Sequence, residues 1–351
     1  MNGPAGRAQT VLGLVDADTL GPTIMHEHLL LYASHIAKQP AAEPERTLFH
    51  APVALDVLGS IRYGKLVNLD NCSLSSEQTA VEETLLFSRA GGRTIVDATS
   101  IGIGRNPTGL ARIARATGLN IVMGCSYYVE ETHPADRNVT ERAEGELAEE
   151  IARDVLEGAD DTGIRAGLIG EVGCSWPLTE VERKVLRASV RAQRMTGAPL
   201  MIHPGRDQGA PGEILAILDQ AGADLSRTVM CHIDRTVDRP EVLAELASTG
   251  CVLEYDLFGF EHSYYPWSLP IDMPNDAGRL RWLRWLIDRG HLDQLVISHD
   301  ICFKDKLVRY GGHGYGHIIQ NVVPLMREKG FGEQEISAIL VDNPRRLLTF
   351  A

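Results

Sequence analysis

The chain has 351 residues, of which 44% are hydrophobic and 23% are charged, proportions that are typical of a globular protein. Its formal net charge of −13 argues against non-specific binding to nucleic acid or to anionic membranes, because both require a basic surface. The sequence contains neither an apolar stretch of 18 residues nor the apolar core of a secretory signal, and its six cysteines are scattered, so we expect a cytoplasmic protein with reduced thiols.

Eight short runs of residues are almost continuously apolar, and amphipathic stretches separate them. Such runs are typical of parallel strands that are covered on both faces. The predicted strands occupy residues 23–28, 94–99, 120–129, 167–173, 199–204, 228–234, 251–260 and 294–301.

The intervening stretches have the pattern of amphipathic helices. Thr-Gly pairs at 117–118 and 196–197 indicate helix C-termini. Eight strands that alternate with helices predict an α/β protein with a (β/α)8 TIM barrel, a fold of about 250 residues plus insertions. An open, doubly wound sheet is the alternative. The predicted helices occupy residues 77–90, 107–117, 139–158, 179–196, 212–221, 239–249 and 277–289.

Two segments depart from this alternation. Residues 29–93 are too long for one helix, so we expect a long first βα loop, and residues 8–20 are expected to form a short extended cover. No segment resembles a linker, a repeat or a low-complexity tract. We therefore expect residues 1–351 to form a single domain.

The carboxyl ends of the predicted strands carry side chains that commonly bind metals, and these ends form the active site of a TIM barrel. His26 and His28 are two residues apart on a strand, so they point the same way while Glu27 points elsewhere. Asp300 rather than His299 is expected to face the barrel mouth, because the site needs a terminal carboxylate that can also accept a proton. The candidate ligands are His26, His28, Glu171, His203, His232 and Asp300.

Neutral imidazole and carboxylate are the usual non-sulfur ligands of zinc and similar metals. A single strand histidine is most often an ordinary buried residue, but chance placement of the whole set at five strand ends is improbable. Six ligands exceed the three that one catalytic zinc needs, and they suit two ions about 3.5–4 Å apart, bridged by a carboxylate and a hydroxide. Each histidine also needs a partner that fixes its tautomer, and Asp234 and Asp256 are candidates.

Two further segments suggest a substrate pocket. Residues 260–267 are aromatic enough to form the wall of an apolar pocket, although they could also pack on a loop or on a second subunit. Loop 8, residues 302–318, is either a solvated surface loop or a cover that attracts an anionic substrate. Its basic residues are Lys304, Lys306, Arg309, His313 and His317.

The sequence resembles the phosphotriesterase-like family of the amidohydrolase superfamily over nearly its whole length. The motifs "GPTIMHEHL", "AGLIGEVGCS", "TGAPLMIHPG", "VMCHIDRT" and "VISHDI" carry this resemblance, which is strongest to the phosphotriesterase-related, resiniferatoxin-binding proteins. It implies that His26, His28 and Asp300 hold the more buried metal and that His203 and His232 hold the more exposed one. Glu171 would bridge the ions, because Gly170 stands at about the place of the carbamylated lysine in the organophosphate-degrading enzymes.

The resemblance also implies a function. A hydroxide that bridges two divalent metals would cleave a carboxylic amide, lactone or ester, such as an N-acyl taurine or another small anionic acyl compound. Zinc is expected, with manganese, cobalt and iron as alternatives. Asp300 would move a proton. Tyr128 would polarise a carbonyl or steady a leaving group, with a packing aromatic as the alternative. Arg235 would face the substrate, with a surface ion pair as the alternative. The alternatives are a phosphotriesterase and a non-catalytic binding barrel. The expected partner is a small-molecule substrate, and a homodimer is plausible.

Overall fold

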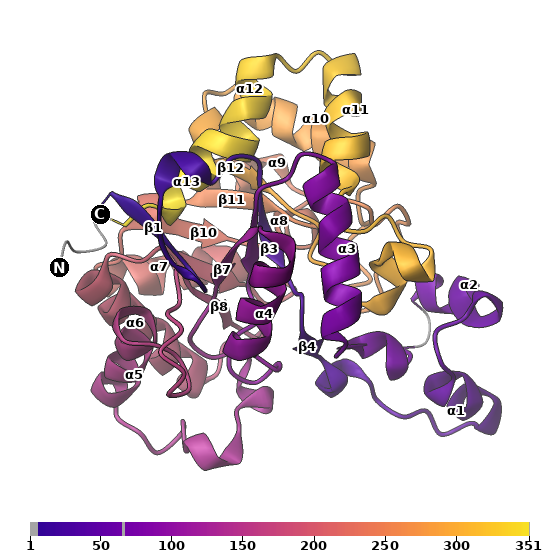
Figure 1. Ribbon diagram of the computed structural model, residues 1–351, viewed down its shortest axis with the longest axis horizontal. Coiled ribbons are helices and arrows are strands. Elements are labelled where there is room, and N and C mark those ends of the chain that lie inside the picture. Colours follow the sequence, from indigo (N-terminus) through magenta and orange to yellow (C-terminus); the bar gives the residue numbers. More distant parts are fainter. Residues whose placement is uncertain (1–5, 65–66, 351) are drawn as a thin grey trace.

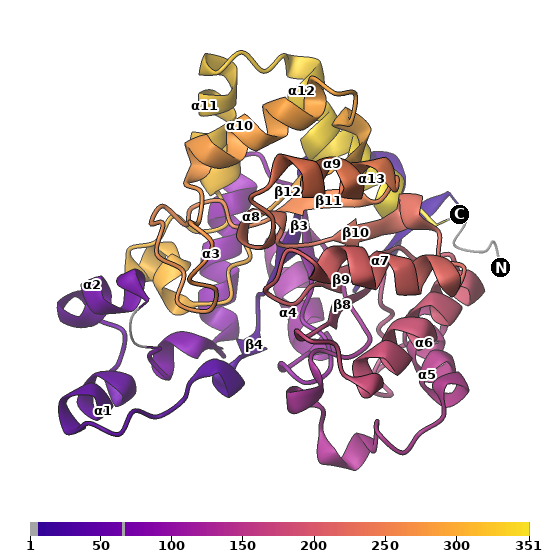
Figure 2. The ribbon, with the colours of Figure 1, turned by 180° about the vertical axis from the view of Figure 1, so that it is seen from behind.

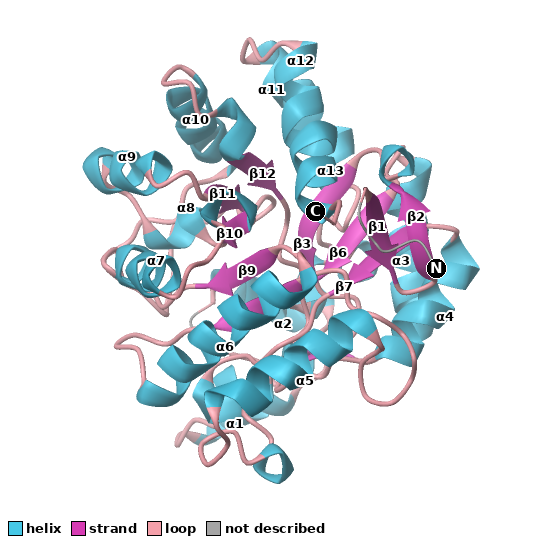
Figure 3. Cartoon of the chain, turned by 90° about the vertical axis from the view of Figure 1, so that its left-hand side faces the viewer, coloured by secondary structure: helices cyan, strands magenta, loops and turns pink. Residues whose placement is uncertain are grey.

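The computed structural model describes residues 6–64 and 67–350. Eight short parallel strands form a ring with helices around it (Figures 1 and 3). The barrel strands are β3 (Thr23–Glu27), β6 (Thr94–Asp97), β7 (Asn120–Met123), β8 (Ile169–Gly173), β9 (Leu200–His203), β10 (Thr228–Met230), β11 (Val252–Tyr255) and β12 (Leu295–Ile297).

The strands pair in the order β3-β6-β7 and β8-β9-β10-β11-β12, and backbone hydrogen bonds join these two groups at both junctions. Between β7 and β8, the Gly170 N–H donates to the Cys125 carbonyl at 2.7 Å. Between β12 and β3, the Asp300 N–H donates to the His26 carbonyl at 3.1 Å. The sheet is therefore closed, which confirms the TIM barrel and makes the open-sheet alternative wrong.

Apolar side chains from alternate strand positions fill the interior of the barrel. Met25, Val96, Val122, Met201 and Val229 belong to one fully buried cluster, because strand side chains alternate between the barrel interior and the helix layer. This packed interior makes the barrel a solid support, so chemistry is confined to its open end.

The helices surround the strands, and most of them begin or end as the sequence predicts. Gly118 and Gly197 end α4 and α6 with φ values of 72°, a left-handed conformation that glycine adopts easily. The α-helices are α1 (Glu43–His50), α2 (Leu55–Tyr63), α3 (Glu77–Arg89), α4 (Pro107–Thr117), α5 (Glu144–Leu156), α6 (Glu180–Thr196), α7 (Ala210–Gln220), α8 (Ile233–Thr236), α9 (Pro240–Ser248), α10 (Asp276–Ile287), α11 (Val323–Glu328), α12 (Glu333–Ser337) and α13 (Asn343–Leu348).

The long first βα segment lies beside the mouth of the barrel. It contains α1 and α2, which extend to the lower right of Figure 1, and the two-residue strands β4 (Leu31–Tyr32) and β5 (Ser73–Leu74). Seen from behind, the segment lies next to the loops that follow β11 and β12 (Figure 2). The Asn71 amide donates to Asp305 at 2.8 Å and ties the segment to loop 8.

The opposite end of the barrel is closed by the predicted extended cover. Strands β1 (Arg7–Thr10) and β2 (Gly13–Asp16) form an antiparallel hairpin. Leu20, Leu347 and Leu348 pack against the interior cluster from this side. Within residues 6–64 and 67–350, no helix is long and apolar enough to cross a membrane.

Candidate metal centre and substrate pocket

The six candidate ligands meet at the carboxyl end of the barrel. Three lie within strands or at a strand end, namely His26 in β3, Glu171 in β8 and His203 at the end of β9. His28, His232 and Asp300 lie one to three residues beyond a strand. Five of the six are buried, and the side chain of Asp300 is 14% exposed. The structure therefore brings together all the residues that the sequence places at this site.

One group of donor atoms forms around His26, His28 and Asp300. His28 Nε2 lies 3.2 Å from Asp300 Oδ1, and His26 Nε2 lies 3.8 Å from the same oxygen. Two ligands that share one tetrahedral ion at about 2.1 Å are about 3.4 Å apart, so these separations suit a common ion. His26 Nε2 is fully buried and makes no hydrogen bond to any described residue. An unpartnered nitrogen at this point fits a metal ligand, because a buried polar atom without a partner is costly.

A second group forms around His203 and His232. His232 Nε2 lies 2.9 Å from His203 Nδ1, and the two nitrogens lie 3.5 and 2.9 Å from Glu171 Oε2. Glu171 Oε1 lies 3.5 Å from His28 Nε2 in the first group. One carboxylate therefore faces both groups, which is the position that a bridging ligand needs.

The protonation of this cluster depends on its buried charges. Burial alone would raise the pKa of Glu171, but His26 and His203 lower that pKa well below its usual value. Burial lowers the pKa of His203 well below its usual value, and the positive charge of Arg235 adds to this shift. An ionised carboxylate and a neutral imidazole are the forms that bind divalent metals. The charge states at these two residues therefore fit a metal centre.

Two buried carboxylates, Glu254 in β11 and Asp256 directly after it, orient two of the histidines. Asp256 Oδ1 accepts a hydrogen bond from His232 Nδ1 at 2.8 Å, as the sequence predicts. Glu254 Oε2 lies 3.3 Å from His26 Nδ1, and sequence reasoning missed this residue. Its position two residues before Asp256, on the same face of the strand, was the available signal.

Asp234 does not orient a histidine, so that part of the expectation is wrong. Its carboxylate accepts hydrogen bonds from the buried Arg279 Nε at 2.7 Å and from the Leu257 N–H at 3.0 Å. Asp234 therefore stabilises the wall of the barrel rather than the metal centre. The residue that orients His28 is Thr99, which sequence reasoning also missed, and its hydroxyl lies 2.9 Å from His28 Nδ1.

The backbone is strained at two of the candidate ligands. His232 has a φ of 55° and Asp300 a φ of 48°, which is the left-handed region that residues other than glycine rarely adopt. The His232 N–H donates to Asp256 Oδ2 at 2.8 Å, and this bond helps to hold the conformation. Such strain commonly occurs at functional sites, where the surrounding structure enforces it.

Comparison with known proteins agrees with this geometry. A model described as the phosphotriesterase family matches residues 6–348. The chain belongs to this family. It is similar to the N-acetyltaurine hydrolase of Xenopus tropicalis, 44% identical over 352 residues, and to that of Homo sapiens, 42% identical over 351 residues, with 100% of each chain covered in both cases. A crystal structure of a resiniferatoxin-binding protein from Rhodobacter sphaeroides is 35% identical, has a TM-score of 0.93 and covers 99% of this chain and 98% of that chain.

Membership of the phosphotriesterase family confirms the resemblance that the sequence motifs indicate. Together with the buried groups of histidine and carboxylate ligands, it makes the chain a hydrolase with a candidate binuclear metal site. The roles of the individual residues at this site remain predictions.

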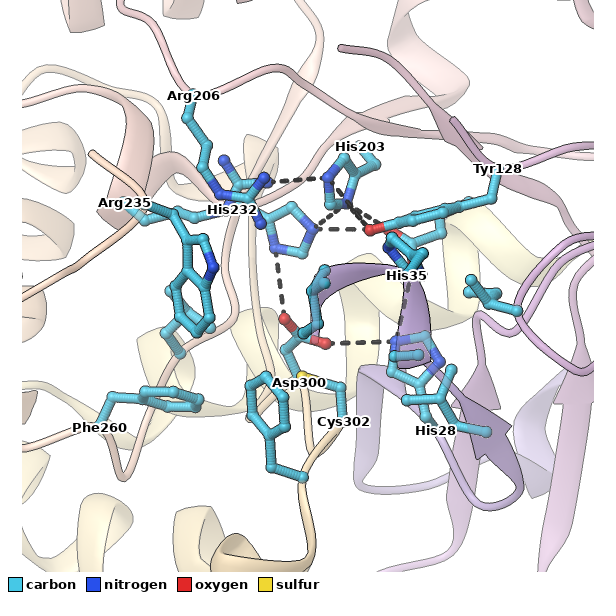
Figure 4. Close-up of a pocket in the computed structure, with 18 of the residues that line it drawn as sticks. His28, His35, Tyr128, His203, Arg206, His232, Arg235, Phe260, Asp300 and Cys302 are labelled. Atoms are coloured by element: carbon cyan, nitrogen blue, oxygen red, sulfur yellow. Dashed lines mark hydrogen bonds and ion pairs between the residues drawn. The ribbon is translucent and has the colours of Figure 1, made fainter. Parts of the chain in front are cut away.

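A pocket opens directly above the six residues and encloses about 640 Å³ of space between protein atoms, part of it open to solvent (Figure 4). Tyr128 and Arg235 lie in its wall, as the sequence predicts. The Tyr128 hydroxyl lies 3.2 Å from His203 Nδ1, and Tyr127 points away into the core. Apolar and aromatic residues form most of the remaining wall, including Leu31, Ile36, Ile103, Leu257, Phe260, Tyr265, Trp267 and Phe303.

The aromatic segment 260–267 has two of the roles considered for it. Phe260, Tyr265 and Trp267 line the pocket. The Trp267 ring also stacks on Phe303 of loop 8, with an interplanar angle of 4°. The segment therefore forms the pocket wall and packs on loop 8 at the same time.

The basic residues of loop 8 lie outside the lining of this pocket, which favours the surface-loop alternative over a cover that attracts the substrate. Lys304 pairs with Asp70 at 2.6 Å. Lys306 pairs with Asp305, and Arg309 pairs with Glu82. The histidines of the loop, His313 and His317, also lie outside the lining and stack on each other at 4.3 Å.

The positive charges that face the pocket are instead Arg235 and Arg206. Sequence reasoning missed Arg206, which lies three residues after His203 in the loop that follows β9. A basic residue so close to the end of a barrel strand was the available signal, since these loops build the site in TIM barrels.

Proposed function

We propose that the protein hydrolyses small N-acyl amides of the N-acetyltaurine type, releasing a carboxylic acid and an amine that carries an acid group. The observation that carries this proposal is a pocket that combines a candidate binuclear centre with two arginines above it. The 42–44% identity to N-acetyltaurine hydrolases over the whole chain supports the same substrate class.

The donor set favours zinc, because it consists of imidazole and carboxylate groups only. His26, His28 and Asp300 would hold one ion, His203 and His232 the other, and Glu171 would lie between them. Bound there, the two ions would polarise the scissile carbonyl and make water a strong nucleophile at neutral pH. Manganese, cobalt and iron suit the same ligands and are the alternatives.

Asp300 is suited to move a proton during the reaction. Its side chain is the most exposed of the six, and its Oδ1 lies 3.2 Å from His28 Nε2. Burial alone would raise the pKa of Asp300, but the hydrogen bond to His28 and the charge of His232 lower it. The ionised carboxylate would accept a proton from the attacking water and then return it to the leaving nitrogen, which must be protonated to depart as an amine.

Tyr128 is suited to donate a hydrogen bond to the substrate. Burial and the negative charge of Glu171 raise the pKa of Tyr128 well above its usual value, so the hydroxyl keeps its proton at neutral pH. The hydroxyl lies at the pocket wall above His203. It would donate to the carbonyl oxygen of the amide as negative charge develops there.

Initial rates on three substrates test the proposal. Protein loaded with Zn²⁺ or Mn²⁺ is assayed with N-acetyltaurine, γ-butyrolactone and paraoxon, and metal content is measured on the same samples. We expect about two metal equivalents per chain and the highest kcat/KM with N-acetyltaurine. Fast turnover of paraoxon alone would favour a phosphotriesterase. Protein without metal and without turnover would favour a binding barrel.

A further inference from the structure

The two arginines of the pocket differ in how their donors are used. Arg235, at the end of the short helix α8, is 2% exposed. Its Nη2 donates to the Pro204 carbonyl at 3.1 Å and lies 3.3 Å from His203 Nε2. Its Nη1 donates to the Thr236 hydroxyl at 3.2 Å. Arg235 is therefore held against the metal centre by the protein itself, as a positioning residue for His203.

Arg206 is held from one side only. Its Nε donates to the Tyr265 hydroxyl at 2.8 Å. Its guanidinium carbon lies 6.0 Å from the centre of the Tyr265 ring and 5.8 Å from the centre of the Trp267 ring. Neither Nη1 nor Nη2 makes a hydrogen bond to a described residue, and both belong to a side chain that lines the pocket.

Arg206 forms no ion pair in the described part of the chain. Among the described residues, no carboxylate lies within 4.0 Å of its nitrogens, and Glu171 and Asp300 are the only carboxylates in the lining of the pocket. Both of these face the metal-binding histidines. A guanidinium that is partly removed from water without an anionic partner is costly, and a fixed fork of free N–H donors is the usual means of binding an oxyanion.

We propose that Arg206 recognises the acid group at the amine end of the substrate and so determines specificity for anionic N-acyl amines. This inference rests on the proposed function and names the residue that selects its substrate. A sulfonate would accept hydrogen bonds from the two free Nη groups, and a short alkyl spacer would lie against Tyr265 and Trp267.

The position of Arg206 gives the substrate a direction in the pocket. In Figure 4, Arg206 lies on the same side of the pocket as His203 and His232, and Asp300 and His28 lie across from this group. With the acid group at Arg206, the amide would lie above the candidate metal centre, next to Asp300 and Tyr128. The acyl group would then point away from Arg206, toward Leu31 and Ala33 of the first βα segment.

Matched variants and matched substrates test this role. Arg206→Gln removes the charge and Arg206→Lys keeps it. Arg239→Gln is the control, because Arg239 is exposed, lies outside the pocket and loses the same charge on substitution. Each protein is assayed with N-acetyltaurine and with N-acetylethanolamine, which has the same spacer and a neutral hydroxyl.

We expect Arg206→Gln to lower kcat/KM for N-acetyltaurine about 10- to 100-fold, chiefly through a higher KM, because a hydrogen-bonded ion pair to the substrate is lost. Turnover of N-acetylethanolamine and metal content are expected to stay at wild-type values. Arg206→Lys is expected to recover part of the loss. An equal fall with both substrates, or no fall with N-acetyltaurine, would overturn the proposal.

Binding of ethanesulfonate, measured by calorimetry, separates this inference from the proposed function. If the wild type hydrolyses neither amide, the proposed function fails, but the role of Arg206 in binding sulfonates is still decided. The role of Arg206 is supported if ethanesulfonate binds to the wild type and to Arg239→Gln but does not bind to Arg206→Gln. Equal affinity in all three proteins, or no binding to the wild type, would overturn it.

Discussion

Asp256 holds His232 at two points. One carboxylate oxygen accepts the imidazole Nδ1–H at 2.8 Å, and the other accepts the backbone N–H of the same residue at 2.8 Å. The first bond directs Nε2 toward Glu171, and the second supports the left-handed backbone at His232. A single side chain thus sets both the tautomer of a candidate ligand and the path of the chain that carries it.

Asp256→Asn should weaken metal binding without unfolding the barrel. An amide offers one acceptor oxygen where two donors need acceptors, so His232 loses part of its orientation. We expect metal affinity to fall about 10- to 100-fold, as measured by competition with a chromophoric chelator. Asp272→Asn, which changes an exposed aspartate, is the control. Equal affinities in wild type and Asp256→Asn would show that this contact does not orient the ligand.

Glu171→Gln should remove at least one metal equivalent together with most activity. The substitution keeps the shape of the side chain but removes the charge that faces both histidine groups. We expect a loss of at least about 100-fold in kcat, with an unchanged circular dichroism spectrum. Elemental analysis of the purified variant checks the metal content. A variant with two metals and full activity would rule out the bridging role.

Tyr128→Phe should affect the chemical step more than binding. The phenyl ring fills the same space, and only the hydroxyl near His203 is lost. We expect kcat to fall about 10-fold or more, with little change in KM and none in metal content, because a single hydrogen bond to the transition state is removed. If KM rises while kcat is unchanged, the hydroxyl contributes to ground-state binding and the proposed role is incorrect.

Asp276→Asn should lower stability in a way that depends on pH. Burial alone would raise the pKa of Asp276, but hydrogen bonds from His317 and Gly259 and the charge of Arg279 lower it to about 2. A depressed pKa stabilises the folded state above the unfolded pKa of about 4, and this contribution disappears as the pH falls through about 2.

We therefore expect Asp276→Asn to reduce the free energy of unfolding by about 2 kcal/mol at pH 7, as measured by urea denaturation. The difference between variant and wild type should shrink as the pH falls from 4 toward 2. A difference that is constant over this range would mean that the ionised carboxylate is not the cause.

The barrel and the candidate ligands could be predicted because local patterns determine them. Each ligand lies at the end of an apolar run, and the twofold alternation of strands separates His26 and His28 from Glu27. The structure agrees, since Glu27 points away and binds His299 Nδ1 at 2.6 Å. Strand alternation therefore separates these two histidines from Glu27, whereas the left-handed backbone at His232 and Asp300 is set by the fold.

The substrate pocket could not be predicted in the same way, because contacts between distant residues decide it. Lys304 faces away from the pocket because it pairs with Asp70, 234 residues earlier in the chain. Arg206 faces the pocket because Tyr265, 59 residues later, binds its Nε. Asp234 lies in α8 and binds Arg279, 45 residues later, whereas Asp256 directly follows β11 and binds His232.

The first and last described residues meet at the closed end of the barrel, where the Gly6 N–H donates to the Phe350 carbonyl at 2.9 Å and the Phe350 N–H donates to the Arg7 carbonyl at 3.0 Å. Residues 6 and 350 are therefore close enough to be joined by a short peptide linker, and new ends could be opened elsewhere in a circularly permuted protein. For the same reason, attachment to a solid support at residue 6 or residue 350 would leave the pocket turned toward the bulk solution.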